Sequence, residues 1–72
     1  MQKKEQSLRE RRREQTWTAI HEAALKRVRK HGMRGTTVEE IAQEAGVSPR
    51  TFFNYFPSKE DAVLGLREPV VS

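Results

Sequence analysis

Helix start and stop signals follow one another closely in the second half of this chain. Thr37 and Glu40 have the spacing of a capping box, and Gly46 is suited to end the helix that they begin. Ser48 comes next as an N-cap with a proline at the following position, and Pro57 closes that second helix. Only short helices fit between these signals, so we predict one from about residue 37 to 45 and another over 49–55.

A further helix is predicted to begin at Ser58, which precedes an acidic first turn, and to end near Pro69. Ahead of all three, a longer helical pattern runs from about Arg9 to His31 and ends at Gly32. Its apolar stripe consists of Trp17, Ile20, Ala24 and Val28, with Ala23 and Leu25 alongside. No strand pattern competes. The predicted fold class is all-α, a three-helix helix-turn-helix domain plus the start of a fourth helix.

The chain has 72 residues, 35% of them hydrophobic, which is enough for one small domain with a thin core. It has no cysteine, so neither a disulfide nor a cysteine-ligated zinc can add to that core. Apolar runs are far shorter than a membrane span. His21 and His31 are too widely spaced for a metal pair, and we expect an exposed helix residue and a helix-end residue. We expect no metal, no cofactor and no enzymatic activity.

The charge is distributed unevenly along the chain. Lys and Arg number 14 against 10 Asp and Glu, and residues 1–31 carry a formal charge of +6. A basic segment on a small domain is typical of nucleic-acid binding or of an anionic membrane surface, although it can also be an ordinary solvated face. Residues 1–10 are expected to form a flexible basic arm. The basic residues at this end that could enter an adjacent minor groove are Lys3, Lys4, Arg9, Arg11, Arg12 and Arg13.

Residues 41–52 have the spacing of a helix-turn-helix. Ala42 is small enough for a close helix crossing, and Gly46 permits the positive φ that reverses the chain in a few residues. Val47 and Phe52 are then placed to fill the angle between the two helices. Each feature alone is weak, but together with two capped short helices they predict this motif.

The helix over 49–55 is expected to have two different faces. Phe52 and Phe56 are the largest apolar groups available for the core, so they should point inward. Arg50 and Asn54 then lie on the opposite face. A guanidinium can donate to both O6 and N7 of guanine, and an amide can pair with adenine. From residue 45 to 59 there are two basic residues and no acidic one, which suits close approach to a polyanion.

Three segments resemble the DNA-binding domain of tetracycline-repressor-type (TetR family) regulators: Thr36–Ala42, Ala45–Ser48 and Thr51–Glu60. The resemblance covers roughly residues 11–66, followed by a C-terminal tail over 67–72. It implies that the third helix enters the major groove of double-stranded DNA and that the fourth leads to a larger ligand-binding and dimerisation domain. That domain is absent from these 72 residues, which look like an excised domain or a natural fragment.

The resemblance also implies which residues contact DNA. They are Thr37, Ser48, Pro49, Arg50, Thr51, Phe53, Asn54 and Tyr55, with a phosphate contact from Lys59. Two positions depart from the family pattern. Phe53 replaces a commoner tyrosine, so stacking on a thymine methyl or sugar is expected there in place of a phosphate hydrogen bond. Arg27 stands where the family often has an apolar residue.

We therefore expect sequence-specific DNA binding in the bacterial cytoplasm, by the domain of a ligand-responsive repressor. The resemblance implies a homodimer on a palindromic operator for the full-length protein, with a small-molecule effector bound only by the missing domain. The fragment itself should be a monomer when free, without membrane association. Two other functions remain open at this stage: a module whose basic first helix binds acidic proteins, and a membrane-surface peptide.

Overall fold

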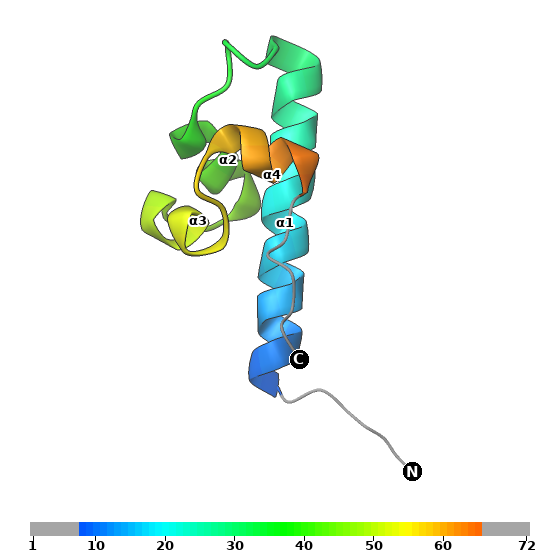
Figure 1. Ribbon diagram of the computed structural model, residues 1–72, viewed down its shortest axis with the longest axis vertical. Coiled ribbons are helices and arrows are strands. Elements are labelled where there is room, and N and C mark those ends of the chain that lie inside the picture. The colour runs from blue at the N-terminus through cyan, green and yellow to red at the C-terminus, as the bar shows by residue number, and fades with distance from the viewer. Residues whose placement is uncertain (1–7, 66–72) are drawn as a thin grey trace.

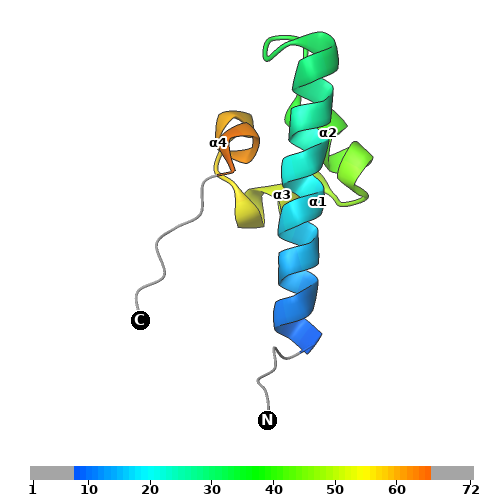
Figure 2. The ribbon, with the colours of Figure 1, turned by 90° about the vertical axis from the view of Figure 1, so that its right-hand side faces the viewer.

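The computed structural model describes residues 8–65, and over that range its regular structure is entirely helical. The chain forms α1 (Leu8–His31), α2 (Val38–Ala45), α3 (Pro49–Tyr55) and α4 (Lys59–Leu64). The long helix α1 contacts both α2 and α4, and α2 contacts α3. Figures 1 and 2 show that the three short helices pack beside the middle and C-terminal part of α1, while its first turns extend beyond them. The predicted fold class is confirmed.

The core lies where the short helices meet α1. Its fully buried members come from every helix and from the turn between α3 and α4: Ile20, Ala23, Ala24, Ile41, Ala42, Phe52, Phe56 and Ala62. Four of these eight residues are alanines, so the backbones approach closely and the two phenylalanines supply much of the buried apolar surface. Full burial of such a ring stabilises a fold by about 1.5–3 kcal/mol. The predicted inward orientation of Phe52 and Phe56 is confirmed.

The predicted helix starts are confirmed by their hydrogen bonds. The Glu40 amide donates to Thr37 Oγ1 at 3.1 Å, and the Thr37 amide donates to Glu40 Oε1 at 3.2 Å, which completes a capping box. Ser48 Oγ accepts the Thr51 amide at 3.1 Å at the start of α3. These bonds satisfy amides that have no partner inside their own helices. The chain therefore has defined places at which each short helix begins.

The turn between α2 and α3 depends on Gly46. Its φ of 81° is in the left-handed region that favours glycine. The Gly46 amide donates to the Gln43 carbonyl at 3.1 Å, and the Val47 amide donates to the Ala42 carbonyl at 2.9 Å. These bonds occupy carbonyls at the end of α2 and turn the chain directly into α3. The helix-turn-helix predicted over residues 41–52 is therefore present.

Helix α4 ends earlier than the sequence pattern predicted. The expected end near Pro69 is wrong, because Gly65 adopts a left-handed conformation with φ 69° and its amide donates to the Asp61 carbonyl at 2.9 Å. The helix stops at Leu64, and residues 66–72 lie outside the described part of the chain. The predicted start at Ser58 is confirmed, since Ser58 Oγ accepts the Asp61 amide at 3.2 Å.

The start of α1, predicted at about Arg9, lies at Leu8 and is confirmed, but the predicted arm over residues 1–10 overlaps it. Residues 8–10, assigned to a flexible arm, form its first turn, and residues 1–7 of that arm lie outside the described range. The helical pattern begins before the apolar stripe because residues 8–16 contain neither proline nor glycine to interrupt it. Nowhere between residues 8 and 65 is there a helix of the length and apolar character that crossing a bilayer requires.

Candidate nucleic-acid interface

Helix α3 is anchored by aromatic rings on one side. Phe52 and Phe56 are buried, with their ring centroids 6.0 Å apart. The Phe56 ring also lies 5.6 Å from that of Trp17, so this end of α3 packs on α1. Aromatic pairs at such distances add to the stabilisation that burial gives. The rotation of α3 about its axis is thereby determined, and with it the direction of its remaining side chains.

Three side chains on the other side of α3 are exposed: Arg50, Phe53 and Asn54. Phe53 is 53% exposed although it is a large apolar residue, and its ring meets the edge of Phe52 at a centroid distance of 5.2 Å. A guanidinium, an amide and a bare aromatic ring therefore occupy one short helical surface. These groups match the donors and apolar contacts that read base edges in a major groove.

The beginning of α3 carries the other polar residues predicted for this interface. Ser48 and Pro49 are exposed, and Thr51 is half-buried. Ser48 Oγ accepts the Thr51 amide and donates to Thr51 Oγ1 at 3.2 Å, so the two hydroxyls lie together. Tyr55 is half-buried and packs against the core, as the sequence predicted for its ring.

Thr37 is exposed at the start of α2, where its hydroxyl caps the helix. The preceding residue, Thr36, is fully buried, and its hydroxyl donates to the Gly32 carbonyl at 2.8 Å. The spacing of residues along the sequence does not indicate this role of Thr36, although a buried threonine needs such a partner. This bond holds the segment between α1 and α2, and so the position of Thr37.

Lys59, predicted to contact a phosphate, is tied to the same segment. Its Nζ donates to the Met33 and Thr36 carbonyls, each at 2.8 Å. An ammonium has three N–H donors, so two are used inside the molecule. The positive charge remains, because carbonyl groups are neutral. Lys59, the first residue of α4, therefore ties that helix to the residues just before α2, a role that the sequence pattern does not indicate.

His21 was expected to be exposed, and that expectation is wrong. The residue is half-buried, its Nδ1 donates to the Ala62 carbonyl at 2.7 Å, and its ring lies 5.1 Å from that of Trp17. The carbonyl can only accept, so the hydrogen is on Nδ1. The contact arises because α4 crosses α1 at this point, which spacing along α1 alone cannot indicate.

Helices α1 and α2 are further joined by an ion-pair cluster. Lys26 Nζ lies 3.1 Å from Glu44 Oε2, and Arg27 Nε lies 3.6 Å from Glu44 Oε1. The hydrogen bond from Lys26, followed by its charge, holds the pKa of the Glu44 carboxyl below its usual value. Arg27 thus lies half-buried beside a carboxylate, at a position where an apolar residue was expected from the family resemblance.

The arginines proposed for a minor-groove arm lie on the first two turns of α1. Arg9, Arg11, Arg12 and Arg13 are all exposed. An α-helix with its side chains is about 10–12 Å across. The minor groove of B-DNA is about 6 Å wide. At these four positions the chain is a helix and not an extended arm, so the backbone itself does not fit that groove.

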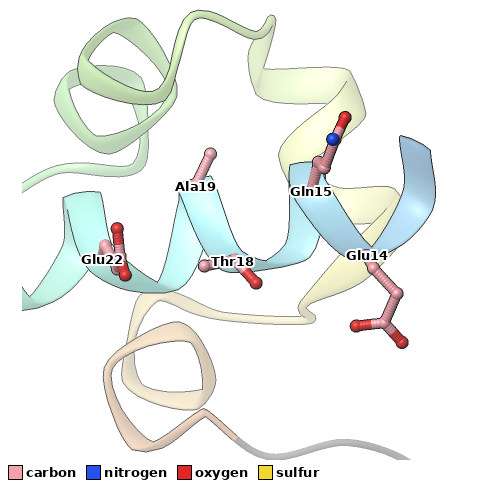
Figure 3. Close-up of a pocket in the computed structure, with 5 residues that line it drawn as sticks. All are labelled: Glu14, Gln15, Thr18, Ala19 and Glu22. Atoms are coloured by element: carbon pink, nitrogen blue, oxygen red, sulfur yellow. The ribbon is translucent and has the colours of Figure 1, made fainter. Parts of the chain in front are cut away.

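A hollow on the surface is lined by Glu14, Gln15, Thr18, Ala19 and Glu22, all from α1, and Figure 3 shows them along one stretch of that helix. It is wide open to solvent, unlike the enclosed clefts that bind ligands. Among residues 8–65 no group of three or more His, Cys, Asp or Glu side chains is placed to hold a metal ion.

Comparison with known proteins gives consistent results. Residues 20–65 match the family described as bacterial regulatory proteins, tetR family. The chain is 42% identical over 57 residues to the HTH-type transcriptional regulator TcmR of Streptomyces glaucescens, which covers 79% of this chain and 25% of TcmR. It is 42% identical over 53 residues to the HTH-type transcriptional regulator RutR of Escherichia coli, which covers 74% of this chain and 25% of RutR.

An uncharacterized HTH-type transcriptional regulator of Bacillus subtilis, YuxN, is 45% identical over 47 residues, or 65% of this chain and 16% of YuxN. The chain thus spans a quarter or less of the length of these relatives. The matched stretch contains α2, α3 and α4 complete, together with the core-forming part of α1. From its helix-turn-helix and these matches, the chain belongs to the tetR family of bacterial regulatory proteins.

Proposed function

We propose that this chain binds double-stranded DNA sequence-specifically, with α3 in the major groove, as the DNA-binding domain of a transcriptional repressor. The observation that carries the proposal is the two-sided α3. Phe52 and Phe56 are buried on one side, and Arg50, Phe53 and Asn54 are exposed on the other. Since the inner rings hold the helix against α1 and α2, the outer groups are presented on a rigid support.

Each outer group has a partner in a base pair. Arg50 donates to guanine O6 and N7, Asn54 pairs with adenine, and the Phe53 ring packs against a thymine methyl. A good bidentate contact discriminates against the wrong base by about 1–3 kcal/mol. Specificity on this proposal comes mainly from Arg50, because its fork of donors is rigid and the segment 45–59 contains no acidic residue to compete for it.

The residues around α3 set its position on the duplex. Thr37, Ser48, Thr51 and Tyr55 supply hydroxyls at the beginnings of α2 and α3 and on the flank of α3, where sugar-phosphate oxygens pass. Pro49 packs against the sugar edge, and the third N–H of Lys59 is available to a phosphate. Such contacts fix register and orientation without reading sequence.

TcmR and RutR are each about four times as long as the segment that matches this chain, and we propose that the full-length protein likewise has further parts. We propose that they form a dimer that holds two of these domains on a palindromic operator, and that a small molecule bound there changes their separation. This segment alone is then a monomer that binds each half-site weakly. Its place is the bacterial cytoplasm, where the DNA is.

Selection from a random duplex library tests the proposal, followed by fluorescence anisotropy over a salt series. We expect one enriched half-site, preferred over a scrambled duplex, and an affinity that falls with salt at a log–log slope near −0.9 per neutralised phosphate. The R50A/N54A variant should fold and lose the preference. Equal and weak binding to selected and scrambled duplexes would contradict the proposal, and would favour an acidic protein as the partner.

Binding to anionic vesicles would favour the membrane-surface alternative. That alternative is disfavoured by the fold, because Ile20 is fully buried and Trp17 packs on Phe56. Neither side chain is then available to enter a bilayer. Absence of vesicle binding together with a selected half-site would leave DNA recognition as the function.

A further inference from the structure

The first turns of α1 extend beyond the rest of the fold. Residues 8–15 are all exposed, and at 1.5 Å per residue they form about 12 Å of helix. In both Figure 1 and Figure 2, α3 is the short helix that lies nearest to this end of α1, and the last turn of α1 lies at the opposite end. A duplex held against α3 therefore passes close to these first turns.

Two arginines of this extension face the side on which the short helices pack. Side chains about 7, 11 or 18 residues apart on an α-helix point in nearly the same direction, because these spacings are close to two, three and five whole turns. Arg13 lies about two turns before Ile20 and three before Ala24, both fully buried. Arg9 lies about three turns before Ile20 and five before Arg27, which packs beside Glu44 of α2. We call Arg9 and Arg13 the inner row.

Arg11 faces the other way. It lies about two turns before Thr18, three before Glu22 and five before Arg29, and all three of these residues are exposed. Thr18 and Glu22 line the open hollow of Figure 3 together with Glu14, so Arg11 shares its face with two carboxylates. That face is unsuited to a polyanion.

The inner row matters because the rest of the interface carries little free positive charge. Arg50 is the sole cation of α3, and Lys59 already uses two donors inside the molecule. Lys26 and Arg27 face the Glu44 carboxylate. Arg29 and Lys30 belong to the last turn of α1, at the far end from α3, and Arg34 is exposed in the turn that follows α1. Yet affinity for duplex DNA depends on cations that displace counterions from phosphates.

We propose that Arg9 and Arg13 bind the phosphate backbone of the duplex beside the half-site read by α3, from the inner face of a helical extension. This deepens the proposed function and rests on it. The occupant is DNA backbone because the row is cationic, lies beyond the packed body and faces the side of α1 on which α3 lies. Arg12 lies on the flank, about two turns before the half-buried Ala19. Arg11 takes no part.

The test compares two double variants of the 72-residue chain that remove the same charge. R9Q/R13Q removes the inner row, and R11Q/R29Q removes two exposed arginines that share the outer face. Binding is measured by anisotropy over a salt series, on the duplex that the library selects, with circular dichroism to confirm equal helix content. For R9Q/R13Q we expect a salt slope shallower by about 1.8, since each phosphate contact contributes about 0.9. For R11Q/R29Q we expect a much smaller change in the salt slope, because exposed charges more than a Debye length from the duplex are largely screened.

Equal changes of the salt slope in the two variants would show that Arg9 and Arg13 make no phosphate contact of their own. The sequence preference attributed to α3 would not be affected by that result. Loss of sequence preference in R9Q/R13Q at equal helix content would also overturn it, since backbone contacts carry no base information. A wild-type chain that binds no duplex at all would instead overturn the proposed function, and this inference with it.

Discussion

The Nζ atom of Lys59 lies 2.8 Å from the carbonyl oxygen of Thr36, and the same distance from that of Met33. The first residue of α4 thereby holds the residue that precedes the N-cap of α2. Two segments that are separate in sequence are thus joined at the start of α4, the shortest of the four helices within residues 8–65. Lys59 has a structural role whether or not it also contacts a phosphate.

The K59M variant should therefore lose stability as well as affinity. Hydrogen bonds from a charged donor contribute about 1.5–3 kcal/mol, and methionine keeps most of the unbranched apolar stem without the donors. We expect a lower midpoint in urea denaturation and weaker binding to all duplexes about equally. An unchanged midpoint would mean that the two carbonyls find equivalent partners without Lys59. K30M, an exposed lysine in the last turn of α1, is the control.

Arg50 should determine preference at one position of each half-site. Arg50→Ala removes a bidentate contact, so discrimination there should fall by about 1–3 kcal/mol while other positions keep theirs. Competition binding against duplexes with single base-pair changes measures this. Arg34 is an exposed arginine outside α3, so Arg34→Ala should leave the discrimination at every base-pair position unchanged. Uniform weakening on every duplex would instead make Arg50 a phosphate contact.

Two glycines with similar backbone angles should respond differently to alanine. Gly46 and Gly65 have φ of 81° and 69°, and an added Cβ meets nothing within 4 Å at Gly46 but lies 2.8 Å from Cε1 of His21 at Gly65. Gly46→Ala should cost about 1–2 kcal/mol for the left-handed backbone alone. Gly65→Ala should cost more, because α4 must also move away from α1.

Denaturant unfolding of both variants measures the difference between them. The double variant G65A/H21A separates the two effects, since removing the ring relieves the overlap. We expect the added cost of Gly65→Ala to shrink when His21 is already alanine. A cost for Gly65→Ala no larger than that for Gly46→Ala would show that the ring adjusts freely.

The ion pair between α1 and α2 should make the free energy of unfolding depend on pH in the acidic range. The pKa of Glu44 is lowered in the folded state by the hydrogen bond and charge of Lys26. The stabilisation that the ionised Glu44 gives to the fold is therefore fully present at a pH above its ordinary pKa of 4.5. It is lost as the pH falls through the lowered pKa of the folded state. The pair is exposed, so the effect should be small and should decrease with added salt.

Thermal unfolding of the wild type and E44Q checks this dependence. At low salt, the wild type should melt at a higher temperature than E44Q at pH 7, and the two melting temperatures should converge as the pH falls below 4.5 and through the lowered pKa of Glu44. E22Q, the same change on the outer face of α1, serves as the control. A difference between wild type and E44Q that does not shrink with falling pH would exclude the carboxylate as its source.

Local signals in the sequence were sufficient for most of the fold. The cap residues Thr37, Ser48 and Ser58 act within their own helices, so their bonds follow from spacing alone. The two inward rings of α3 followed from the scarcity of other large apolar groups. Together these predicted the helix-turn-helix and the direction of its outer face.

Contacts between distant parts of the chain could not be predicted in the same way. His21 and Ala62 are 41 positions apart, and Lys59 and Met33 are 26 apart. Such bonds depend on where helices cross, which periodicity along one helix does not specify. The end of α4 was missed for a different, local reason: the apolar residue after Gly65 favoured continuation, while the left-handed backbone of the glycine ended the helix.

Trp17, the only tryptophan of the chain, lies on α1 between the ring of His21, one turn further along the same helix, and the ring of Phe56. Its indole thus touches the side chain that holds α4 and the ring that ends α3. Any separation of either helix from α1 changes the surroundings of one chromophore. The domain consequently contains an intrinsic fluorescent reporter, whose emission follows the docking of its DNA-facing half without a label.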